Sequence, residues 1–136
     1  MPRKIMPPNV LPEAAPYWQA ANEGRLLVKH CTACGKAHHY PRDICPHCLS
    51  DATEWRDAAG TGTLYSFSTM GQGDAAYTIA FVTLDEGVAM MSNLVESEPA
   101  QARIGQPSVE PRVGARVRVV FQPAANGQAV PMFTLS

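Results

Sequence analysis

The sequence predicts a mainly β protein with a short N-terminal helix, a small metal-binding module and a C-terminal five-stranded barrel. Three observations carry this prediction. Four cysteines form two Cys-x2-Cys pairs, one helix-like stretch precedes them, and five short strand-like segments follow them. We expect an N-terminal arm and helix over residues 1–24, a metal ribbon over 25–58 and a barrel over 59–136.

Length and charge limit the classes of function. The chain has 136 residues, is 46% hydrophobic, and carries 11 Lys plus Arg against 12 Asp plus Glu. This composition is typical of a globular core, and the absence of a basic excess disfavours a polyanion partner. No apolar run reaches the ~18 residues that a membrane span needs. The basic residues near the N-terminus precede no apolar run, so we expect no secretory signal, reduced thiols and a cytoplasmic protein.

The N-terminal region predicts an arm followed by one helix. Residues 1–12 contain four prolines, which favours an extended arm. A helix is predicted over Pro16–Glu23, because proline suits a first helical turn and Gly24 suits the position after a helix end. Its apolar residues recur at helical spacing, at Tyr17, Ala20 and Ala21.

The cysteine spacing predicts one metal site with the ligands Cys31, Cys34, Cys45 and Cys48. Two intervening residues allow a tight turn that aims both sulfurs of a pair at one point. Two such turns supply four thiolates, the ligand set of structural zinc. Gly35 follows the first pair, where the turn favours positive φ, whereas Leu49 stands at the matching place after the second pair. A closed four-thiolate site leaves no position for a catalytic water, so the metal is expected to be structural.

Other interpretations of the cysteines remain open at this stage. Two disulfides or a redox Cys-x-x-Cys pair would use the same residues, although no βαβ pattern surrounds them. Iron takes the same four ligands as zinc, and the spacing does not separate the two metals. His47 is a possible substitute ligand. The basic residues near the cysteines, interpreted here as solvated surface, could also offset the negative charge of the thiolates.

The C-terminal half predicts a barrel of the OB type. The expected strands are residues 63–69, 77–84, 88–95, 113–121 and 130–135, preceded by a short strand at 26–28 in the metal module. The link Asp85-Glu86-Gly87 suits a hairpin, because glycine accepts positive φ. The two acids are expected at a solvated turn. Five strands with turn signals between them are typical of a small OB barrel.

The chain offers few groups for catalysis. We find no Gly-x-Ser-x-Gly, P-loop or His-Glu-x-x-His pattern. The Gly60-Thr-Gly62 segment precedes a strand and is interpreted as a bend into the barrel. The long polar segment 96–112 is expected to be a loop available to a partner.

Several of these segments resemble a known family. The runs Gly24–Gly35 and Tyr40–Cys48, then Trp55 and Gly60–Ser66, look like the acyl-CoA-associated zinc-ribbon/OB-fold family, once catalogued as a domain of unknown function. Later pieces match in the same order, namely Leu84–Gly87, Ser92–Val95, the segment from Val113 to Phe121, and Pro131–Phe133. The resemblance spans about residues 12–135 and departs at Leu49, where relatives commonly have glycine.

The resemblance implies an N-terminal helix, a rubredoxin-like zinc ribbon and a C-terminal OB barrel. It also implies a non-catalytic accessory subunit of a thiolase-fold enzyme, which acts as a thiolase, acyltransferase or retro-aldolase on CoA thioesters. Some relatives pair instead with hot-dog-fold hydratases. In such complexes the partner supplies the catalytic residues, and the small subunit helps to shape the CoA path.

Two arginines are candidates for contact with the CoA phosphates or with an acidic partner. Arg116 and Arg118 alternate with apolar residues, so both are expected on one face of the fourth barrel strand. Guanidinium groups suit phosphate, although a solvated face would show the same pattern. The alternative function is a nucleic-acid-binding module, with aromatic residues of the barrel stacking on bases. The balanced charge disfavours that alternative.

Overall fold

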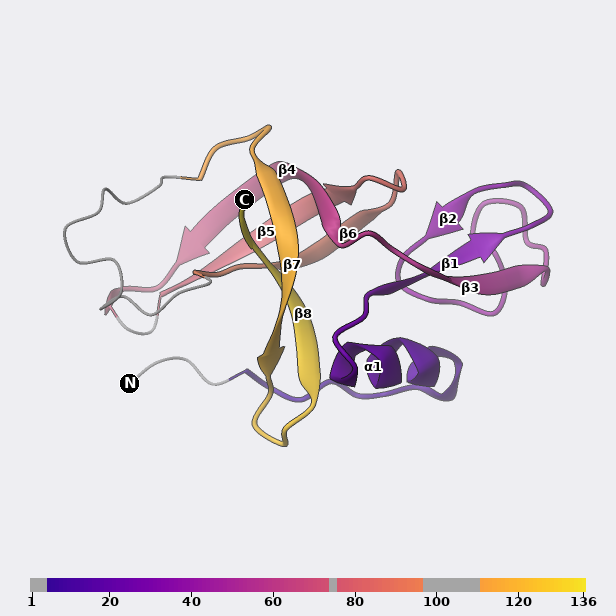
Figure 1. Ribbon diagram of the computed structural model, residues 1–136, viewed down its shortest axis with the longest axis horizontal. Coiled ribbons are helices and arrows are strands. Elements are labelled where there is room, and N and C mark those ends of the chain that lie inside the picture. Colours follow the sequence, from indigo (N-terminus) through magenta and orange to yellow (C-terminus); the bar gives the residue numbers. More distant parts are fainter. Residues whose placement is uncertain (1–4, 74–75, 97–110) are drawn as a thin grey trace.

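A computed structural model describes residues 5–73, 76–96 and 111–136 and contains two β sheets and one α-helix (Figure 1). The predicted helix is α1 (Ala15–Asn22), which follows a 3-10 turn at Pro12–Ala14. Pro16 lies in its first turn and Gly24 has a φ of +77°, as the sequence predicted. None of the helices in these ranges is long and apolar enough to cross a membrane.

The cysteine-rich region forms a three-stranded antiparallel sheet in the order β2-β1-β3. Its strands are β1 (Leu27–Cys31), β2 (Ala37–His38) and β3 (Thr53–Asp57). The sequence predicted only β1, and it missed β2 and β3. β2 has only two residues, too few to show a period. β3 has polar residues on both sides of Trp55, so neither strand carries the alternating apolar pattern that predicts a strand.

The C-terminal region is a closed five-stranded barrel, which confirms the predicted OB fold. Its strands are β4 (Thr61–Met70), β5 (Tyr77–Leu84), β6 (Ala89–Leu94), β7 (Arg116–Pro123) and β8 (Ala129–Leu135). They follow the order β4-β5-β6-β8-β7, and β7 closes the barrel on β4. Gly87 has a φ of +87° in the β5–β6 turn, so that predicted hairpin is also confirmed.

The barrel entrance and the start of β7 show two uses of glycine. A Cβ on Gly62 would lie 2.6 Å from the carbonyl oxygen of Thr83, so only glycine allows β4 and β5 to approach this closely. Gly114, at φ +91°, turns the chain before β7, which is why that strand begins at Arg116 and not at Val113. Most of the long loop expected over 96–112 lies outside the described residues.

The core is shared by all three parts of the chain. Inward side chains of the barrel are fully buried, namely Leu64, Val82, Leu84, Val117 and Phe133. Tyr17 and Ala20 of α1, together with Leu26, Leu27 and Val28 of the ribbon, belong to the same apolar cluster. In Figure 1 the ribbon therefore lies at one end of the barrel, with α1 beside both.

Polar contacts fix α1 to the turn between β7 and β8. The side-chain oxygen of Asn22 accepts hydrogen bonds from the backbone N–H of Ala129 at 2.9 Å and from Nε2 of Gln128 at 3.1 Å. Gln128 Nε2 also donates to the carbonyl oxygen of Trp18 at 3.0 Å. The middle and the end of the helix are thereby joined to the barrel.

Candidate metal centre

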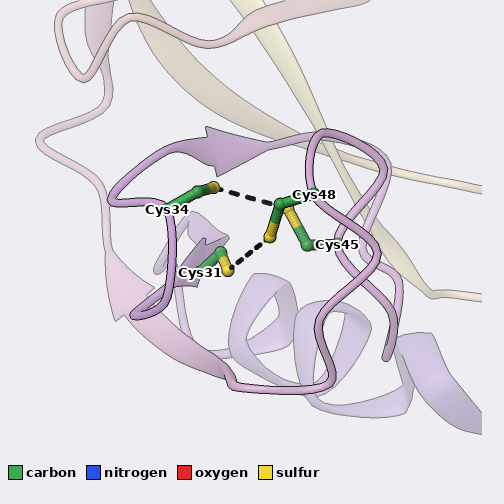
Figure 2. A group of neighbouring side chains, drawn as sticks. All are labelled: Cys31, Cys34, Cys45 and Cys48. Carbon is green, nitrogen blue, oxygen red and sulfur yellow. Dashed lines mark hydrogen bonds between the residues drawn. The ribbon is translucent and has the colours of Figure 1, made fainter.

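The four predicted ligands lie together in the ribbon (Figure 2). All four sulfurs are within 4.8 Å of one another, with 3.6 Å between Cys31 and Cys48 and 3.8 Å between Cys34 and Cys45. A disulfide needs about 2.05 Å between sulfurs, so none is formed. A tetrahedral ion with metal–sulfur bonds of about 2.3 Å places its ligands about 3.8 Å apart. The cluster therefore has the dimensions of a four-thiolate metal site.

The two cysteine pairs sit on equivalent turns. In the first, the Gly35 N–H donates to the carbonyl oxygen of Cys31 at 2.9 Å, and the Cys31 N–H donates to that of Lys36 at 2.9 Å. In the second, Leu49 bonds to Cys45 at 2.9 Å and Cys45 to Ser50 at 2.8 Å in the same pattern. Two equal turns facing each other produce the four-sulfur cluster.

Leu49 adopts the backbone conformation of its glycine counterpart. Its φ is +66° and that of Gly35 is +77°, and Leu49 is the non-glycine residue with positive φ in the described chain. The side chain is 78% exposed, so packing does not compensate for the strain. The sequence identified this departure, and the structure shows that the turn survives it.

Backbone donors and burial control the charge of the sulfurs. Hydrogen bonds from the backbone of Cys34 and Ala33 lower the pKa of Cys31 to about 7, against the opposing effect of burial. The Ser50 N–H also lowers the pKa of Cys48, but burial and the three neighbouring thiols outweigh it and raise that pKa to about 12. Four thiolates this close therefore need a cation to carry their charge together.

Two of the basic residues near the site, Lys29 and His38, are buried, contrary to the expectation of a solvated surface. Lys29 is 6% exposed, and its ammonium lies 4.5 Å from the centre of the Trp55 ring. It is also 3.8 Å from a carboxylate oxygen of Asp43, in the loop between the cysteine pairs. The lysine therefore ties that loop to the sheet. Its aliphatic stem is buried while its ammonium contacts Trp55 and Asp43, which the sequence pattern alone does not predict.

His47 is not part of the cluster. Its backbone N–H donates to the sulfur of Cys45 at 3.4 Å, and the residue is exposed. The cluster of candidate ligands found among the described residues contains the four cysteines alone. These thiolates fill a tetrahedral shell and could hold one metal ion, with no position left for a substrate.

The two candidate arginines lie outside the metal site, on β7. Both are exposed on either side of buried Val117, which confirms the predicted alternation. Arg116 donates to both carboxylate oxygens of Asp85 at 2.8 and 2.9 Å. Asp85 is thus part of an ion pair and not only a solvated turn residue. Within the described ranges, no carboxylate lies at ion-pair distance from Arg118.

An aromatic groove was missed by the sequence analysis. It has a volume of about 420 Å³ and lies between α1 with the loop after β2 on one side and β5, β6 and β8 on the other. The aromatic side is formed by Tyr17, Trp18, His39 and Tyr40. Trp18 Nε1 donates to the Tyr40 hydroxyl at 2.8 Å. These four aromatic rings come from two segments about 22 residues apart in the chain. They meet only in the folded protein, so no local sequence pattern predicts the groove.

A rubredoxin-like four-cysteine ribbon joined to a closed OB barrel defines the class of this protein. Residues 18–54 match the family model described as the ChsH2 rubredoxin-like zinc ribbon domain. Residues 55–122 match that of the ChsH2 C-terminal OB-fold domain. The chain belongs to this family, which includes proteins named for the DUF35 domain.

Curated relatives share parts of the chain. It is 34% identical over 114 residues to a probable enoyl-CoA hydratase alpha subunit of Thermomonospora curvata, covering 79% of this chain and 36% of the relative. It is 29% identical over 97 residues to a DUF35 domain-containing scaffold protein of Methanocaldococcus jannaschii, covering 65% of this chain and 68% of the relative. The chain thus spans about a third of the first relative's length.

Solved structures extend the similarity to nearly the whole chain. One chain of a structure described as the Ltp2-ChsH2(DUF35) aldolase matches with a TM-score of 0.74 and 29% identity, covering 95% of this chain and 98% of that one. A DUF35 protein of unknown function from Sulfolobus solfataricus matches with a TM-score of 0.62 and 11% identity, covering 92% and 86%. The second match supports the fold alone.

Proposed function

We propose that this protein is a non-catalytic accessory subunit of an acyl-CoA-processing complex, in which a thiolase-fold enzyme supplies the reacting groups. The observation that carries the proposal is the match over 95% of the chain to a chain of an aldolase assembly. The scaffold names of the archaeal relatives support the same role. The thiolase fold of the partner rests on the family resemblance of the sequence.

Zinc is the metal proposed for the ribbon. Four thiolates at tetrahedral spacing suit zinc, and the ribbon family is described by that metal. A zinc ion bound by four cysteines has no open coordination position, so it stabilises the ribbon without activating water. Since the ribbon shares its apolar cluster with α1 and the barrel, its metal also supports the surface offered to a partner.

A hydratase complex is the second candidate. The Thermomonospora relative is named as a hydratase subunit and is 34% identical over the matched part. That match covers only 36% of the relative, so the matched part need not carry the hydratase chemistry. The accessory role is the same in both candidates, and they differ in the partner and in the reaction.

Co-expression tests the proposal. The tagged chain is produced with a thiolase-fold enzyme and, separately, with a hot-dog-fold hydratase from the same genome. Co-elution on size exclusion and increased thiolysis or retro-aldol cleavage with the first enzyme are the expected results. Assembly with the hydratase alone would favour the second candidate. Separate elution and equal activity of both enzymes without this chain would refute the accessory role.

A nucleic-acid assay completes the experiment. Binding of single-stranded DNA or RNA that weakens steeply with salt would favour the alternative of a nucleic-acid module. We expect no such binding, because the barrel strands β4, β5 and β6 present aromatic residues without accompanying basic ones. Stacking platforms for single strands need cationic side chains along the phosphate path.

A further inference from the structure

Three neighbouring strands of the barrel carry no charged side chain. β4, β5 and β6 contain no Asp, Glu, Lys, Arg or His, although each has residues that face outward. The next strand, β8, is also uncharged, whereas β7 and the ribbon strands β1 and β3 each contain charged residues. A solvated barrel wall normally alternates inward apolar residues with outward polar or charged ones. The outer wall of β4–β6 keeps Ser, Thr and Asn residues but has no charged ones.

Large apolar side chains occupy the centre of this wall. Phe81 pairs with Met91 on β6 and with Ser66 on β4, so these three side chains lie on one face. Their neighbours Ala80 and Val82 are fully buried, which places Phe81 on the outside. Met91 is 62% exposed, Phe81 44%, and Tyr65, beside the irregularity in the β4–β5 pairing, 70%.

The wall continues into the aromatic groove. Met91 lines that groove together with Ile79 and Asn93, which pair with each other across β5 and β6. On the far side of β4 lies β7, where Arg116 pairs with Thr63 and Arg118 with Thr61. An uncharged centre, a concave groove of about 420 Å³ and a charged border on the β7 side are features of a protein–protein interface.

We propose that the outer wall of β4–β6, centred on Tyr65, Phe81 and Met91, is the surface that docks the partner enzyme. This inference rests on the proposed function. The occupant is an uncharged apolar face of that enzyme, with an aliphatic or aromatic side chain in the groove. Charge decides the choice of occupant, because a charged partner surface would be desolvated here without an opposite charge.

Charge insertion tests the surface. Tyr65→Lys and Met91→Lys, singly and together, place an ammonium in the wall at its two most exposed apolar positions. Ile44→Lys is the matched control, because Ile44 is 50% exposed on the ribbon. Affinity for a thiolase-fold enzyme is measured by biolayer interferometry. Circular dichroism and zinc content establish that every variant is folded.

The outcomes separate the surface from the function. We expect the double variant to weaken binding by about tenfold or more, with Ile44→Lys unchanged. If wild type and all variants bind equally, the wall is not the docking surface and the accessory role stands. Equal loss in the control also overturns the inference. If wild type binds no enzyme, both fail. A dimer of this chain that the double variant dissociates assigns the wall to a second copy and overturns the enzyme as occupant.

Discussion

Arg116 and Asp85 form a two-pronged ion pair between β7 and the turn that joins β5 to β6. Hydrogen bonds from Arg116 and then from the hydroxyl of Thr61 lower the pKa of Asp85 to about 2. The pair thus stays charged at all physiological pH values. Arg116, one of the two arginines that are candidates for phosphate contact, is therefore already engaged in a contact within the chain.

The two arginines should therefore differ in their effect on CoA binding. Arg118→Ala is expected to weaken CoA binding by the assembled complex several-fold, because no carboxylate of the described residues pairs with its guanidinium, which suits phosphate. Arg116→Ala should weaken it less, since that guanidinium already has a carboxylate partner. Isothermal titration with CoA measures both, with Arg56→Ala on the ribbon as the control. If both variants bind CoA with the affinity of the wild-type complex, neither arginine contributes to CoA binding.

Metal content follows from the ligand geometry. Purified protein should contain about one zinc per chain by elemental analysis, and Cys31→Ser should lose it and unfold the ribbon. His47→Ala is the matched control, because His47 lies between ligands and contributes only its backbone. Full loss of zinc in the control would show that the imidazole is a ligand after all. A wild-type chain with iron in place of zinc would correct the metal alone.

The strained turn after the second cysteine pair predicts a stabilising substitution. Leu49→Gly should raise the free energy of unfolding of the metal-loaded protein by about 0.5–1 kcal/mol, because glycine adopts positive φ without a Cβ penalty. Gly35→Ala should lower it by about 1 kcal/mol. A Cβ at Gly35 meets no atom within 4 Å, so that cost comes from backbone strain. Thermal unfolding of both variants checks the opposite signs.

His39 predicts a loss of stability at acidic pH. Burial, and to a smaller degree the nearby His38, lower the pKa of His39 from 6.5 to about 4. Between pH 6.5 and pH 4 the unfolded chain therefore binds more protons than the folded protein. The free energy of unfolding is highest above the pKa that His39 has in the unfolded chain, and it falls as the pH decreases toward 4. The expected loss is about 2 kcal/mol between pH 7 and pH 5. His39→Gln should remove that part of the slope in urea unfolding, and an unchanged slope would contradict the assignment.

The sequence predicted those parts of the fold that local patterns encode. The four ligands, the helix and all five barrel strands follow from spacing, alternation and turn residues. The register of β4 against β5, the burial of Lys29 over Trp55 and the pairing of Arg116 with Asp85 depend on residues far apart in the chain. Local patterns do not specify such contacts. The lack of charged residues in β4, β5 and β6 can be read from the sequence, but only the strand order places these three strands side by side in one wall.

The strand order also sets the sequence of events during synthesis. β8, the fifth barrel strand along the chain, lies between β6 and β7, so the barrel remains open until β8 has left the ribosome. α1 precedes the ribbon and the barrel in the chain, but the hydrogen bonds that hold it to Ala129 and Gln128 form only after these residues have been made. The four cysteines are complete far earlier. A nascent chain truncated after Arg112 should therefore take up metal while its unfinished barrel stays sensitive to protease, which assigns the first folded part of this protein to its ribbon.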